Sequence, residues 1–196
     1  MNDDEANYIK ALFQQHPDAT KVLFDANIFN YAAAAEESIG INLFAFLASC
    51  ENSFNWYVIE FEAEKLLNSG KFNREIMYHH IIPCKDVGIK KMSGGLPHIN
   101  KQTGELEFWS LNTISYGDYM QVALAHNFPE LTIITNDSKL FKSGHAVLDG
   151  RVVPFHTFID EIPYWRDNRD WVRLQKWFHE NVKLLRNNSS WILEKK

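Results

Sequence analysis

Short apolar runs alternate along the chain with longer segments in which apolar residues recur at helical spacing. The apolar runs are dense in Val, Ile, Leu and aromatic residues, as are strands that are covered on both faces. We expect strands at 21–25, 56–59, 81–83, 131–135 and 152–158. We expect helices at 3–15, 27–38, 42–52, 60–70, 116–128, 138–144 and 170–188. Strands that alternate with helices predict right-handed crossovers and a largely parallel sheet, which defines an α/β fold.

One stretch departs from this alternation. Residues 98–109 carry a hairpin pattern around the turn residues 102–105, and a Gly pair lies in the loop before them. We therefore expect one domain over residues 1–163 with an insertion at about 85–108. A C-terminal helical extension, residues 164–196, follows and is expected to pack on that domain.

Composition places the chain among ordinary globular proteins, with 45% apolar and 23% charged residues. Its apolar runs fall short of the roughly 20 residues that a membrane helix needs, so we expect no membrane partner. The first ten residues are acidic, whereas a secretory signal would be basic and then apolar. Cys50 and Cys84 lack metal-ligand spacing, which suits a reducing cytoplasm and leaves a single disulfide open.

Charge is distributed unevenly along the chain. Residues 164–196 contain eight Lys or Arg and four Asp or Glu, a net charge of +4. The whole chain has a net charge of −5, so −9 falls on residues 1–163. Such asymmetry is typical of an appendage that faces a polyanion, and a solvated amphipathic helix has the same composition.

Acidic residues follow or precede the expected strands at equivalent places. Asp25 ends the first strand, Asp137 follows the strand 131–135, and Asp118 opens the helix before that strand. Three further acids come directly after the second strand: Glu60, Glu62 and Glu64. In parallel sheets ligands gather at the carboxyl ends of the strands, so these acids are expected to converge on one edge.

Carboxylates that converge repel one another and lose hydration, which raises their pKa values unless something compensates. Divalent cations are the natural compensation, and hard oxygen ligands favour Mg²⁺ or Mn²⁺ over zinc. Two such ions can clamp the attacking and leaving oxygens of a phosphoryl displacement. Each acid taken alone is also an ordinary helix cap.

Four motifs in this order resemble the PIN-domain nucleases: VLFDAN, EFEAEKLL, GDYMQVALAHN and LTIITNDSKL, which together span about 21–158. The resemblance implies a three-layer sandwich around a central, mostly parallel sheet, and metal-dependent cleavage of RNA, in some members DNA. Carried over by motif, the metal-binding and catalytic acids are Asp25, Asp118 and Asp137, with Asn27 and Thr135 in support.

The second acid of the family fits this sequence less directly, because it comes early in the helix after the second strand and just before a Leu. Glu64 precedes Lys65 and a Leu pair and is the expected metal-binding and catalytic residue. Glu60 lies on the same helix face at i, i+4 and is held in reserve, while Glu62 is expected to point elsewhere.

Basic residues in the two added segments are candidates for binding RNA. Lys90 and Lys91 lie in the insertion, and Arg169, Arg173 and Lys176 lie in the extension. The extension also carries four Trp residues that could stack on bases, but packing against the body or a dimer partner is the favoured explanation for them.

The preferred hypothesis is a cytoplasmic metal-dependent ribonuclease that acts on single-stranded or structured RNA. The toxin of a toxin–antitoxin pair, with an antitoxin protein as partner, is a narrower form of it, and a homodimer is compatible with it. The alternative is a catalytically silent PIN-like scaffold that binds RNA or protein. A phosphatase of the haloacid-dehalogenase kind is disfavoured, because it needs a second Asp where this chain has Asn27.

Overall fold

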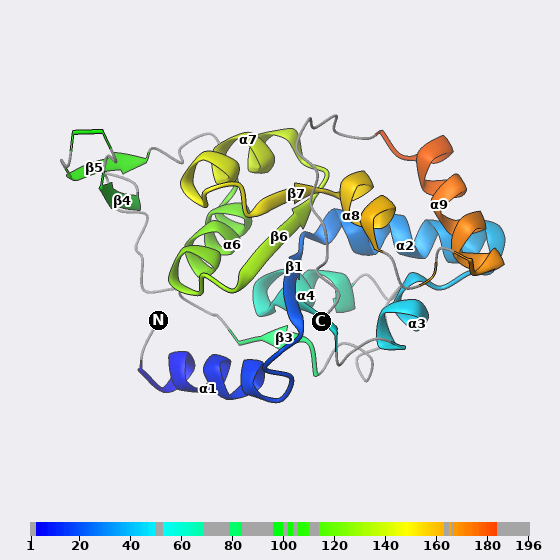
Figure 1. The fold of residues 1–196 in the computed structure, drawn as a ribbon, viewed down its shortest axis with the longest axis horizontal. Coiled ribbons are helices and arrows are strands. Elements are labelled where there is room, and N and C mark those ends of the chain that lie inside the picture. Colours follow the sequence, from blue (N-terminus) through cyan, green and yellow to red (C-terminus); the bar gives the residue numbers. More distant parts are fainter. Residues whose placement is uncertain are drawn as a thin grey trace.

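The computed structural model is built around a five-stranded sheet in the order β3-β2-β1-β6-β7, with every neighbouring pair parallel (Figure 1). The residues it describes are 3–49, 53–68, 79–83, 96–99, 102–103, 106–109, 114–162, 165 and 167–183. The strands are β1 (Thr20–Phe24), β2 (Phe54–Ile59), β3 (Ile81–Ile82), β6 (Leu131–Thr135) and β7 (Val152–Pro154). The central strands are buried throughout their length, as the dense apolar runs predict.

Helices cover both faces of this sheet, so the α/β sandwich with a parallel sheet is confirmed. In Figure 1 one group lies on the left, formed by α1 (Asp3–Gln14), α6 (Tyr116–Asn127) and α7 (Ser138–Val147). The group on the right is formed by α2 (Ala26–Ile39), α3 (Leu43–Ala48), α8 (Phe155–Glu161) and α9 (Arg169–Asn181). Helix α4 (Glu60–Asn68) follows β2 and packs on the α2 side of the sheet through Ala63 and Leu66.

Alternate residues of β1 point to opposite faces of the sheet. Val22 and Phe24 belong to the apolar cluster beneath α2, α3, α8 and α9. Leu23 belongs to the cluster beneath α1, α6 and α7. This period of two is the ordinary side-chain geometry of a strand, and here both faces are apolar because both are covered.

The last expected strand is shorter than predicted. We expected a strand over 152–158, but β7 ends at Pro154 and α8 begins at Phe155. Pro154, with φ −63°, is the N-cap residue of the new helix, where its missing N–H is harmless. Phe155, Phe158 and Ile159 are then spaced for one helical face, and all three are buried in the core.

Helix α9 packs on the body through one apolar stripe formed by Trp171, Leu174 and Phe178. The Trp171 ring lies 5.3 Å from that of Phe46 and 4.8 Å from that of Trp165, measured between centroids. The first half of the extension therefore joins the apolar core beneath α2 and α8.

The predicted hairpin is confirmed as an antiparallel pair of strands, β4 (Leu96–Ile99) and β5 (Leu106–Trp109). Apart from residues 102–103, the rest of the insertion lies outside the described residues, as do residues 184–196. Among the helices that the structure describes, none is long and apolar enough to cross a membrane.

Candidate active site

Asp25 lies at the centre of the candidate site. It follows β1 directly, at the carboxyl edge of the sheet, and is only 7% exposed. Its Oδ2 accepts hydrogen bonds from the Thr135 hydroxyl and from the Asn27 amide, each at 2.6 Å. Its Oδ1 accepts a longer one, 3.5 Å, from Nε2 of Gln121. Asp25 is also the N-cap residue of α2, but its side chain makes no capping hydrogen bond there, so the carboxylate faces the site.

The pKa of Asp25 is raised from its ordinary 3.8 to about 6, and burial is the largest cause. The negative charges of Asp118 and Glu62 contribute to this rise, which places both carboxylates near Asp25. The hydrogen bonds from Thr135 and Gln121 lower the pKa but do not offset burial and repulsion. The site therefore holds a carboxylate whose charge is under-compensated.

Asp118 combines a local structural role with its place near Asp25. Its Oδ2 accepts the N–H of Ser115 at 3.1 Å, and its own N–H donates to the Ser115 hydroxyl at 3.2 Å. This reciprocal capping box fixes the start of α6 and the direction of the Asp118 side chain.

Asp137 lies at the end of the adjacent strand, β6, and is linked to Asp25 through Thr135. The buried Thr135 hydroxyl donates to Asp25 and accepts the backbone N–H of Asp137 at 2.9 Å. Oδ1 of Asp137 caps α7 by accepting the N–H groups of Lys139 and Leu140, at 2.7 and 2.9 Å. Asp137 is thus both a helix cap and a neighbour of the site.

The acid of α4 that acts on Asp25 is Glu62, whereas the Glu64 side chain is exposed to solvent. The expectation that Glu62 points elsewhere is wrong: it is only 7% exposed, and Oε1 lies 3.0 Å from Nζ of Lys65. The reserve candidate, Glu60, is the first residue of α4 and is half-buried.

Gly117 explains why Glu62 can turn inward. A Cβ atom at Gly117 would overlap Oε1 of Glu62, so a larger residue at the start of α6 would require this carboxylate to shift from its place. The Leu pair after Glu64 favours that residue in the sequence, whereas the room for Glu62 depends on Gly117 of another helix. A glycine at the start of a neighbouring helix, next to Asp118, was the signal that could have identified Glu62.

Gln121 is a site residue that sequence reasoning missed. It lies one turn after Asp118 on α6 and is only 1% exposed, within an otherwise apolar stretch of the helix. A polar residue that is fully buried at the site edge needs an explanation, and its contact with Asp25 supplies part of one.

The donor chemistry of the site fits a hard divalent cation, since its side chains offer carboxylate, hydroxyl and amide oxygens. Over the described residues, no three Asp, Glu, His or Cys side chains are already grouped as a metal site. The residues therefore fit a cation by type and by charge. A cation would offset the burial and the repulsion that together raise the pKa of Asp25.

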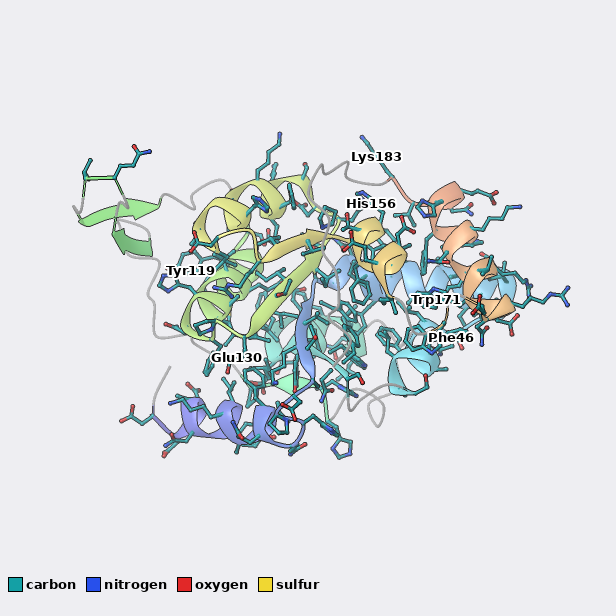
Figure 2. All side chains as sticks on the ribbon, in the orientation of Figure 1. Phe46, Tyr119, Glu130, His156, Trp171 and Lys183 are labelled. Carbon is teal, nitrogen blue, oxygen red and sulfur yellow. The ribbon has the colours of Figure 1, made fainter. Side chains whose placement is uncertain are left out.

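The candidate RNA-binding residues of the extension lie on the exposed face of α9. Arg173 pairs with Asp170 at 3.1 Å and Lys176 with Glu180 at 3.7 Å, while Arg169 is exposed. The chain just after α9 returns to the acidic edge, where the amide of Asn136 donates to the carbonyl of Lys183 (labelled in Figure 2). Lys90 and Lys91 lie outside the described residues.

A cavity of about 350 Å³ lies elsewhere, beside the first half of β2, and none of the acids discussed above lines it. Its wall includes His80, whose ring stacks on Trp56 at 3.8 Å between centroids. Nδ1 of His80 lies 2.9 Å from the carbonyl oxygen of Trp56. The cavity and the acidic site are thus separate features of the sheet.

Comparison of the chain with protein-family models, with curated proteins and with solved structures found no match. The class that fold and site define is an α/β protein with a parallel sheet and buried acids at its carboxyl edge.

Proposed function

We propose that this chain is a PIN-like, metal-dependent ribonuclease that hydrolyses phosphodiester bonds at the acidic edge of the sheet. The observation that carries the proposal is the under-compensated charge of Asp25, with Asp118 and Glu62 close enough to raise its pKa. Glu62 of α4 and Asp118 of α6, both distant in sequence from Asp25, act there on the acid that follows β1. Lys65 already pairs with Glu62, but among the described residues the charge of Asp25 meets only hydrogen-bond donors, and a cation would compensate it.

In this proposal Asp25, Asp118 and Glu62 hold Mg²⁺ or Mn²⁺, and Asp137 contributes from the end of β6. A bound divalent ion would supply an activated water and neutralise charge on the phosphate. Thr135 and Asn27 fix the direction of the Asp25 carboxylate. Burial of Asp25 limits how far bulk water screens its charge, which strengthens the electrostatic contacts that this carboxylate makes.

A cleavage assay tests the proposal. The intact chain is incubated with single-stranded RNA, duplex RNA and single-stranded DNA, each with Mg²⁺, Mn²⁺ or EDTA. We expect metal-dependent cleavage of RNA that falls at least about 100-fold in Asp25→Asn, since removing one ligand or preorganised group typically has effects of this size. Equal cleavage by wild type and Asp25→Asn would assign the activity to another site or to a contaminant.

The second candidate is a silent scaffold that binds RNA or protein. It is favoured by the finding that the acids within the described residues are not already arranged as a three-ligand metal site. RNA binding by the wild type without metal-dependent cleavage in the same assay would support this candidate instead.

A further inference from the structure

Two buried amide oxygens flank the carboxylate of Asp25 and have no hydrogen-bond partner among the described residues. They are Oε1 of Gln121 and Oδ1 of Asn27. The nitrogen of each amide donates to a different oxygen of Asp25. We propose that Gln121 is a positioning residue whose carbonyl oxygen accepts a hydrogen bond from a water molecule of a hydrated divalent cation at Asp25. This inference rests on the proposed metal-dependent function and adds a residue and a binding mode to it.

Both oxygens need a hydrogen-bond donor. A buried carbonyl without a donor is costly, and Gln121 is almost fully buried. The neighbouring carboxylates of Asp118 and Glu62 are acceptors when ionised, so they cannot supply a donor. A phosphate group is an acceptor as well. The missing donors can therefore come from water, either alone or carried into the site by a bound ligand.

The two amides limit the choice of ligand further. The two unpartnered oxygens belong to different side chains, so a ligand that serves both must present at least two donors. A divalent cation that keeps part of its water shell does this, and Mg²⁺ gives up its waters reluctantly. Its positive charge also suits the carboxylate, whereas a neutral donor would leave the repulsion among the acids unchanged.

Cation binding by the intact protein tests the inference without relying on cleavage. Mn²⁺ is titrated calorimetrically at pH 8 into wild type, Gln121→Met and Gln121→Glu. Gln175→Met is the matched control, because Gln175 is a partly buried glutamine on α9 whose amide donates to the carbonyl of Ile159. We expect the Kd for Mn²⁺ to rise about 10-fold in Gln121→Met, within the range found for groups that support metal ligands, and to stay unchanged in the control. Gln121→Glu keeps an acceptor oxygen and should bind Mn²⁺ at least as tightly as wild type.

A second probe tests hydrogen bonding from the metal's bound donors to Gln121, without direct bonds between the metal and the protein. Hexaamminecobalt(III) carries six ammine donors that do not exchange, so it can bind only through hydrogen bonds and charge. We expect it to compete with Mn²⁺ in wild type and to compete less well in Gln121→Met. An unchanged Kd in Gln121→Met, or an equal loss in Gln121→Glu, would overturn the inference while leaving the proposed function in place. A wild type that binds no Mn²⁺ would overturn both.

Discussion

Asp25 is a buried carboxylate with donors from Thr135, Asn27 and Gln121, and its negative charge still opposes folding above about pH 6. Because its folded pKa is raised from 3.8, the folded state binds the proton more tightly than the unfolded chain. This contribution to stability is full below pH 3.8 and is lost as the pH rises through about 6.

Asp25→Asn should therefore stabilise the metal-free protein at pH 8, by roughly 1–3 kcal/mol, and should have little effect at pH 4. The carbonyl of Asn can take the hydrogen bonds from Thr135 and Asn27, and the free Oε1 of Gln121 can accept from its amide. Urea unfolding in EDTA at the two pH values measures the difference. A loss of stability at pH 8 would instead identify Asp25 as a structural residue.

His80 titrates in the opposite sense. Burial lowers its pKa from 6.5 to about 4, and the hydrogen bond to the Trp56 carbonyl only partly offsets this effect. The folded state therefore binds this proton less tightly than the unfolded chain. The stabilising effect is full above pH 6.5 and is lost as the pH falls toward about 4.

His80→Phe keeps a ring to stack on Trp56 but removes the titration. Between pH 7 and pH 4.5 the free energy of unfolding should fall by roughly 1–3 kcal/mol less in the variant than in wild type. Other groups titrate equally in both proteins. The difference between the two curves of unfolding free energy against pH therefore reports on His80 alone. Parallel curves would show that His80 is charged in the folded state at pH 4.5.

The junction of helices α4 and α6 decides which acid of α4 serves the site. Glu62 and Glu64 form a matched pair of acids on one helix, one buried and one exposed. Glu62→Gln should lower metal-dependent cleavage at least about 10-fold, whereas Glu64→Gln should leave it within about twofold of wild type. Single-turnover rates at saturating Mn²⁺ measure both effects. The reverse result would restore the sequence-based assignment of Glu64.

Gly117→Ala tests the same junction without changing a charge. The added methyl group would overlap Oε1 of Glu62 and force this side chain away from α6. Ala favours the helix by roughly 0.5–1 kcal/mol, so part of the steric cost is offset and the fold should persist. We expect weaker Mn²⁺ binding together with a change in thermal midpoint of only a few degrees. Wild-type binding would show that Glu62 is not held by this contact.

Elements were more predictable from sequence than side-chain direction. The strands at 131–135 and 56–59 are dense apolar runs, and burial on both faces of the sheet is what such runs encode. The sequence 152–158 was misread because Pro154 and the spacing of Phe155, Phe158 and Ile159 favour a helix where the apolar content alone suggested a strand. Glu62 was missed because its direction depends on Gly117, and Gln121 because its partner, Asp25, is 96 residues away.

The molecule as a whole is acidic, with a net charge of −5, and must still attract RNA if the proposed function holds. The C-terminal extension is the described segment best placed to do so. Its helix packs on the body through Trp171, Leu174 and Phe178 and turns its basic residues to solvent. The hydrogen bond between Asn136 and Lys183 brings the chain after α9 to the residue next to Asp137.

The triple variant Arg169→Ala, Arg173→Ala and Lys176→Ala should weaken RNA binding and flatten its salt dependence. The log–log slope falls by about 0.7 for every phosphate of a single strand that the protein no longer neutralises. Arg173 and Lys176 already have acidic partners. The slope should therefore fall by about the amount expected for one phosphate contact, not for three. Single-turnover cleavage at saturating RNA should hardly change, since these residues lie outside the acidic cluster.

The reciprocal variant removes the acidic partners instead. Asp170→Asn with Glu180→Gln frees Arg173 and Lys176, so RNA binding should tighten and the slope should steepen by about 0.7 or more. RNA affinity is measured from about 50 to 200 mM salt in both variants. The slope should flatten in the triple variant and steepen in this one. If neither variant changes affinity or slope, α9 is a solvated face, and the RNA must approach the acids over another surface.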